Sequence, residues 1–112
     1  MPTVNVYSLK QTNIKDLQNL TLNLKTFLAA KLTCGDIKLT PEEISIRFIE
    51  VSGGKMIGDV ELEITAHAFG ERVNNQDQIC LDVMNYIKER VPSVGNIKVW
   101  LKLCELGHSW EK

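Results

Sequence analysis

Residues 60–68 alternate strictly between apolar and polar side chains. The apolar positions are Val60, Leu62, Ile64, Ala66 and Ala68, and the polar positions are Glu61, Glu63, Thr65 and His67. Successive side chains of a β-strand point to opposite faces of its sheet, so this pattern predicts a strand with one dry face and one polar face. The fold is constrained accordingly, because helices are then expected to cover only the dry face.

Three further segments are predicted to be strands. Residues 3–8 and 97–104 show the same alternation, and residues 44–51 follow it in part. The segment 40–43 reads Thr-Pro-Glu-Glu, which predicts one capped helical turn directly before the predicted strand at residues 44–51. Residues 52–58 are rich in glycine but lack the spacing of a phosphate-binding loop, so we interpret them as a plain connection.

Apolar residues at helical spacing predict two long helices. The first is expected to start at Thr12 or Asn13 and to end at Gly35. The second is expected to start at Asn74 or Asn75. The element order is therefore strand, helix, strand, followed by strand, helix, strand.

This order predicts an α/β (α+β) fold. Two βαβ units would form a four-stranded sheet with two helices on one face, within a single domain spanning residues 1–112. The other face of the sheet would be polar and uncovered by any element of the chain. Either water or other subunits would then cover it.

The composition excludes several functional classes. The formal net charge is -1, so neither a nucleic-acid partner nor a membrane surface is expected. No apolar run approaches the ~18 residues that span a bilayer, and the start of the chain has no leader pattern, so we expect a cytoplasmic protein. Cys34, Cys80 and Cys104 are expected to be reduced. His67 and His108 lack neighbours at ligand spacing, so no metal site is expected.

The chain begins Met1-Pro2, directly before a predicted strand. If methionine aminopeptidase removes Met1, Pro2 becomes a free secondary amine. An ordinary α-amino group has a pKa of ~7.7–8.0, so a modest loss of hydration would leave the amine neutral and basic at working pH. While Met1 stays attached, the nitrogen is an amide and cannot act as a base. The alternative is that Pro2 only begins a strand, where a missing N–H does no harm.

This arrangement resembles the tautomerase superfamily. The resemblance rests on Met-Pro before a strand, a long helix, a proline-containing turn, a strand reading Ser45-Ile46-Arg47-Phe48-Ile49-Glu50, and a second βαβ unit. Relatives include 4-oxalocrotonate tautomerase, 5-carboxymethyl-2-hydroxymuconate isomerase and macrophage migration inhibitory factor. The layout is similar to that of the longer, two-unit members, which are trimers. The resemblance therefore implies a homotrimer in which the polar sheet face lies toward other subunits.

The resemblance also implies a site. Pro2 matches the catalytic N-terminal proline, which moves a proton on a 2-keto or 2-hydroxydienoate substrate without a cofactor. Arg47 falls at a position where several members have an arginine that holds a substrate carboxylate. Gly70-Glu71-Arg72 resembles the Gly-Arg-Ser corner from which other members supply a second arginine. A guanidinium suits this chemistry, because it binds a carboxylate bidentately and stabilises charge that develops on oxygen. The start of the first helix, Leu9-Lys10-Gln11-Thr12, lacks the corresponding arginine.

Two tryptophans are further candidates for the substrate site. Trp100 and Trp110 can wall an apolar pocket near the terminus, or they can be a sheet-face residue and a packed tail residue, respectively.

The arginines also have alternative interpretations. Arg47 can pair with Glu61 or Glu63 across the sheet, and Arg72 can be an exposed corner charge.

Three functions remain compatible with the sequence. The leading hypothesis is cofactor-free proton transfer on a small carboxylate-bearing 2-keto acid or enol, with Pro2 as base. The second is a non-catalytic oligomer with the same fold. The third is a ferredoxin-like βαββαβ module that binds a ligand or partner on its open sheet, since the element order is shared. In that module the first and third strands are adjacent at the centre of the sheet.

Overall fold

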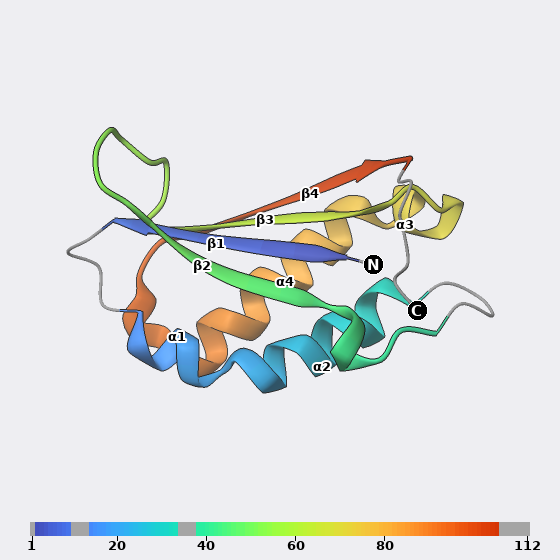
Figure 1. The fold of residues 1–112 in the computed structure, drawn as a ribbon, viewed down its shortest axis with the longest axis horizontal. Helices are drawn as coiled ribbons and strands as arrows, with labels where there is room; N and C mark the ends of the chain where they lie inside the picture. The colour runs from blue at the N-terminus through green and yellow to red at the C-terminus, as the bar shows by residue number, and fades with distance from the viewer. Residues whose placement is uncertain (1, 10–13, 34–37, 106–112) are drawn as a thin grey trace, which may run out of the picture.

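The computed structural model describes residues 2–9, 14–33 and 38–105 of the chain. Its four strands are β1 (Thr3–Leu9), β2 (Ser45–Val51), β3 (Val60–His67) and β4 (Ile97–Cys104). They form one sheet in the order β2-β1-β3-β4 (Figure 1). Within each βαβ unit the two strands are parallel neighbours, and the units join through the antiparallel pair of β1 and β3. The predicted α+β layout is confirmed.

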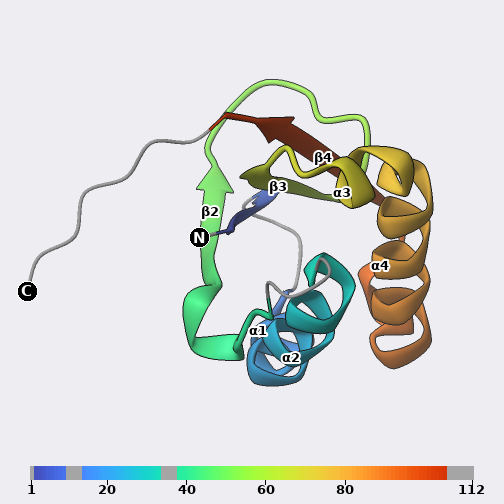
Figure 2. The ribbon, with the colours of Figure 1, turned by 90° about the vertical axis from the view of Figure 1, so that its right-hand side faces the viewer.

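The helices are α1 (Lys15–Asn19), α2 (Thr21–Leu32), α3 (Gly70–Asn74) and α4 (Gln76–Arg90), with 3₁₀ turns η1 (Pro41–Glu43) and η2 (Pro92–Val94). All four α-helices lie on one side of the sheet, and the other side is left uncovered by the described part of the chain (Figure 2). No helix among the described residues is long and apolar enough to cross a membrane.

The first predicted helix is broken in the structure. At Leu20 the backbone N–H bonds to the Leu17 carbonyl (3.1 Å), three residues back instead of four. The Thr21 hydroxyl donates to the Gln18 carbonyl (2.6 Å), so a side chain occupies an acceptor of the helical ladder. The prediction of one continuous helix was therefore wrong. Its predicted ends at residues 12–13 and 35 lie outside the described residues.

The second predicted helix has a separate first turn. The corner that contains Gly70-Glu71-Arg72 forms the short helix α3, and Asn75 separates α3 from α4. Asn75 is the N-cap residue of α4, as predicted, but its side chain does not cap the helix. Its amide instead donates to the Glu71 carbonyl (2.8 Å), which ties the two helices together.

The core lies between the sheet and the helices. Strand β3 alternates between buried and half-buried residues along its whole length, as the sequence predicted. The largest fully buried side chains are Leu17, Leu24, Leu28, Leu32, Ile44, Leu62, Ile64, Ile87, Ile97, Val4, Val6 and Val60. The turn at η1 leads the chain from α2 into β2, and there the Thr40 N–H donates to Glu43 Oε2 (2.8 Å).

Strand pairing argues against the ferredoxin-like alternative. Strands β1 and β3 are adjacent at the centre of the sheet, so the criterion that we set from the sequence does not separate the two folds. In a split βαβ arrangement, however, another strand lies between the two strands of each unit. Here β1 is hydrogen-bonded directly to β2, and β3 directly to β4.

Candidate functional site

Pro2 lies at the end of the sheet that is close to α3 and the end of α2. It is buried, and its carbonyl accepts a hydrogen bond from the Ser45 N–H of β2 (3.3 Å). It is in phase with Val4 and Val6, which are fully buried, so the proline ring faces the helix side of the sheet. Thr3 pairs with Thr65, and continuing this antiparallel register places Pro2 opposite Ala66. We call Pro2, Ser45, Ala66, His67 and Arg72 the Pro2 end.

Arg72 is buried at this end, with 3% of its surface exposed. Its Nε donates to the Leu32 carbonyl (2.9 Å) at the end of α2, and its Nη1 donates to the His67 carbonyl (3.0 Å) at the end of β3. The guanidinium also stacks over the Phe69 ring at 4.9 Å. A cation is favourable beside the carbonyls of a helix C-terminus. The interpretation of Arg72 as an exposed corner charge is therefore wrong.

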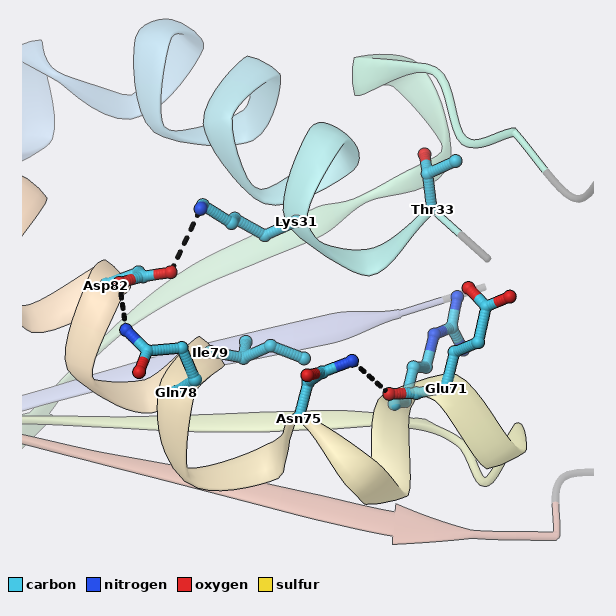
Figure 3. A pocket seen from close by; sticks show the side chains of 8 residues that line it. Lys31, Thr33, Glu71, Asn75, Gln78, Ile79 and Asp82 are labelled. Carbon is cyan, nitrogen blue, oxygen red and sulfur yellow. Dashed lines mark hydrogen bonds and ion pairs between the residues drawn. The ribbon is translucent and has the colours of Figure 1, made fainter. Parts of the chain in front are cut away.

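A polar cavity of about 240 Å³ opens beside Arg72, between α2 and the helices α3 and α4 (Figure 3). Its lining residues are Lys31, Thr33, Glu71, Arg72, Asn75, Gln78, Ile79 and Asp82. The Lys31 ammonium bonds to the Asp82 carboxylate (2.9 Å), which also accepts from Gln78 (2.7 Å). These two hydrogen bonds hold the pKa of the Asp82 carboxyl below its usual range.

Arg47 lies on the open face of the sheet, away from the helices. It is exposed and stands in register with Asn5. The ion pairs among the described residues do not include Arg47, because β1 separates β2 from the carboxylates of β3. The alternative interpretation, an ion pair with Glu61 or Glu63, is therefore not found. The guanidinium of Arg47 is open to solvent or to another molecule.

The pairing registers place four side chains in one row across the open face. This row contains Arg47 on β2, Asn5 on β1, Glu63 on β3 and Trp100 on β4. The Asn5 amide donates to Glu63 Oε1 (3.3 Å), but Asn5 Oδ1 is buried without a hydrogen-bond partner among the described residues. Sequence reasoning gave Asn5 no role, because nothing in a strand pattern shows whether an amide will be satisfied.

Trp100 is on the edge strand opposite to Arg47. Its side chain is 48% exposed, and its indole N–H donates to Glu61 Oε1 (3.3 Å). Three strand spacings of ~4.8 Å separate the two ends of the row. One copy of the chain therefore does not bring Trp100 and Arg47 together, and Trp110 lies outside the described residues.

Two other features of this region bear on its chemistry. His67 and Cys104 are register partners on β3 and β4, near Pro2, although they are distant in the sequence. The His67 ring packs against Phe69 (4.6 Å), the residue that also stacks on Arg72. Within the described ranges, no cluster of three His, Cys, Asp or Glu residues is arranged to hold a metal ion.

Comparison by sequence identifies no relatives. No protein-family model matches the chain, and no curated protein matches it.

Comparison by structure finds clear likenesses. A Vibrio cholerae protein of unknown function has a TM-score of 0.68 at 11% identity, over 98% of this chain and 83% of that chain. A macrophage migration inhibitory factor-like protein from Entamoeba histolytica has a TM-score of 0.62 at 10% identity, over 96% and 95%. A fused 4-OT, described as a symmetric trimer, has a TM-score of 0.59 at 12% identity, over 96% and 91%. The chain therefore has the fold of tautomerase-superfamily structures.

Proposed function

We propose that this chain is a tautomerase-like isomerase that transfers a proton on a small 2-keto acid or a 2-hydroxydienoate-type enol. After removal of Met1, the Pro2 amine would be the general base. No cofactor takes part in this mechanism, since the base and the charge-stabilising groups both come from the protein.

The placement of Pro2 carries the proposal. Pro2 immediately precedes the central strand β1 and is buried, in a chain that has the fold of a macrophage migration inhibitory factor-like protein. Burial disfavours a charged amine, so a free Pro2 amine at this position would have a lowered pKa. A larger fraction of it would then be unprotonated at neutral pH, and able to accept a proton, than at an exposed terminus. The fold likeness alone would not supply a base.

Arg47 is the proposed carboxylate anchor. Of the three arginines, Arg72 donates to two backbone carbonyls, and Arg90 stacks over Tyr86 at 3.8 Å on α4. Arg47 is exposed on the open face, whereas Pro2 faces the helix side. The planar fork of Arg47 would therefore bind the carboxylate and the negative charge on the enolate oxygen of a substrate at the Pro2 site of a neighbouring copy. A second anchor at Arg72, which the resemblance implies, would have to bind the substrate with the donors that those two backbone carbonyls leave free.

A homotrimer is part of the proposal. The open face carries the buried and unpartnered Asn5 Oδ1, a group that a donor from another molecule would satisfy. The fused 4-OT with this fold is a symmetric trimer. Trp100 would then reach a Pro2 site only from a neighbouring copy, and Trp110 is proposed as a second wall of the same site.

The test begins with the mass of the purified protein. Chains without Met1 are then assayed by ultraviolet absorbance for ketonisation of 2-hydroxydienoates and enolised 2-keto acids. Replacing Pro2→Ala should lower the rate by roughly 100-fold to 10,000-fold, the loss expected for a positioned general base. An unchanged rate contradicts the role of Pro2. Arg47→Lys should raise KM more than Arg90→Lys, which serves as the matched surface control.

A non-catalytic oligomer is the second candidate function. The occupied fork of Arg72 favours it, because an arginine that binds backbone carbonyls has fewer donors left for a substrate. Retention of Met1 on all molecules, together with trimers in light scattering, would support this candidate over the enzyme.

A further inference from the structure

Another cavity, of about 290 Å³, lies between α4 and the edge strand β4. Its walls are Cys80, Leu81 and Met84 of α4 and residues 97–100 of β4. In Figure 2, α4 lies on the side of the molecule away from β2. The cavity has no lining residue in common with the cavity beside Arg72 or with the Pro2 end, so it is a separate feature of the surface.

The walls of this cavity are apolar except at Lys98. Leu81 is 46% exposed and Trp100 is 48% exposed, so large apolar surfaces are open to a ligand. Burial raises the pKa of the Cys80 thiol, and the charge of Asp77 adds to this effect, so the thiol stays uncharged at neutral pH. An uncharged thiol behaves as a small apolar group. An aliphatic chain in this cavity would therefore remove apolar surface from water on both sides.

Lys98 supplies the charge of the cavity. Its side chain is half-buried, and it belongs to neither of the ion pairs that the described residues make. Glu61 is its register partner on β3, but Glu61 Oε1 accepts from the Trp100 indole N–H (3.3 Å). As an edge strand, β4 also presents backbone N–H groups that no other described strand accepts. An ammonium beside free N–H donors is suited to binding a carboxylate.

We propose that this cavity binds a small aliphatic carboxylate, with the apolar chain against Leu81, Met84 and Trp100 and the carboxylate at the Lys98 ammonium. A volume of about 290 Å³ is just below the roughly 300–1,000 Å³ of pockets for drug-sized ligands, so the ligand is small. This inference goes beyond the proposed function and does not rest on it, because no residue of the Pro2 end lines the cavity.

The test is a titration of the full chain with hexanoate, followed by ¹H–¹⁵N NMR. Hexanoate should shift the amide signals of residues 80–84 and 97–100 and leave those of Thr33 and Arg72, at the other cavity, unchanged. The affinity should rise by up to about fourfold for each CH₂ group added from butanoate to hexanoate, the factor expected when that group is buried.

Variants of the charged groups test the carboxylate. Lys98→Gln should weaken hexanoate binding by about fivefold, the upper end for a partly exposed ion pair, and should leave the binding of hexanol unchanged. Lys102→Gln is the matched control, because it removes an exposed ammonium of the same strand outside the cavity. Glu61→Gln should tighten hexanoate binding, since it removes the negative charge in register with Lys98 but keeps an oxygen acceptor for the Trp100 indole.

A variant of α4 tests the apolar wall. Leu81 is partly exposed and glutamine is a good helix former, so Leu81→Gln should fold normally. It should weaken hexanoate and hexanol by the same factor, because it removes apolar contact and no charge. Leu22→Gln, at an exposed position of α2 outside the cavity, is the control and should change neither affinity.

Three outcomes would overturn the inference. The first is the absence of shifts at residues 80–84 and 97–100. The second is an equal loss of hexanoate affinity in Lys98→Gln and Lys102→Gln, or an equal loss of hexanoate and hexanol affinity in Lys98→Gln, since the Lys98 charge would then not select the ligand. The third is binding that occurs only when the protein is diluted to monomers, because a second copy of the chain would then be the occupant of the cavity.

Discussion

The two βαβ units have the same layout but cover their edge strands differently. In the second unit α4 packs on β4, and Ile97 and Leu101 of that strand are buried. In the first unit α2 contacts the η1 turn, and no residue of β2 is buried, although Ile46 and Phe48 of that strand pack against the core. An uncovered edge strand is a site for association with another chain. The comparison shows that, in the described part of the chain, the edge at β2 is less covered than the edge at β4.

The largest expected difference between the two regions is the loss of unfolding free energy when a large apolar side chain is truncated to alanine. Leu62 is fully buried at the centre of the sheet, so Leu62→Ala should lower the free energy of unfolding by about 2–5 kcal/mol. Phe48 on β2 is only half-buried, so Phe48→Ala should cost about 1 kcal/mol in dilute monomeric protein. Urea denaturation measures both. A larger loss for Phe48→Ala would mean that β2 is covered after all.

Among the described residues, two glycines with positive φ give a second contrast. Gly95, before β4, has φ of 83°, and an added Cβ would lie 2.6 Å from Asp59 Oδ2, which accepts from the Asn96 N–H. Gly54, in the loop after β2, has φ of 93° and open space around it. Gly95→Ala should therefore cost about 2–3 kcal/mol and Gly54→Ala about 1 kcal/mol, by thermal unfolding. Equal losses of stability in the two variants would show that the atoms around Gly95 can move to make room for the added Cβ.

The next largest effect on stability is expected from the contact between α2 and α4, the main helices of the two units. Phe27 of α2 stacks on Tyr86 of α4 with ring centroids 4.0 Å apart. A double-mutant cycle of Phe27→Leu and Tyr86→Leu should give a coupling free energy of about 0.5–1.5 kcal/mol. The matched cycle of Leu22→Ala with Tyr86→Leu, in which Leu22 is 71% exposed on α2, should give none. Similar coupling in both cycles would argue against a specific stack.

The smallest expected effect is the pH dependence of the ion pair between Lys31 on α2 and Asp82 on α4. The pKa of Asp82 is lowered in the folded protein, so its contribution to stability is present above the unfolded pKa of about 3.9 and is lost as the pH falls through the folded value. Tm should differ slightly between wild type and Asp82→Asn at pH 7, and the difference should vanish in acid and shrink in high salt. A Tm difference that persists at pH 2 would contradict the ion pair as its source.

The sequence determined the strands, the capped turn before β2 and the polar face of the sheet. Alternation is a local property, and each residue of β3 has the burial that its own type favours. The same reasoning gave one long helix where the structure has α1 and α2, because the Thr21 hydroxyl competes for a backbone carbonyl in a way that apolar spacing does not reveal.

Only the tertiary structure decided what the arginines do. Arg47 and Arg72 look alike in the sequence, as cations at positions that resemble a family's binding residues. Burial of Arg72 depends on the Leu32 carbonyl, 40 residues earlier, and exposure of Arg47 depends on β1 lying between β2 and β3. A charge takes its role from the distant groups that the fold places beside it, because solvation and hydrogen bonding act through space and not along the chain.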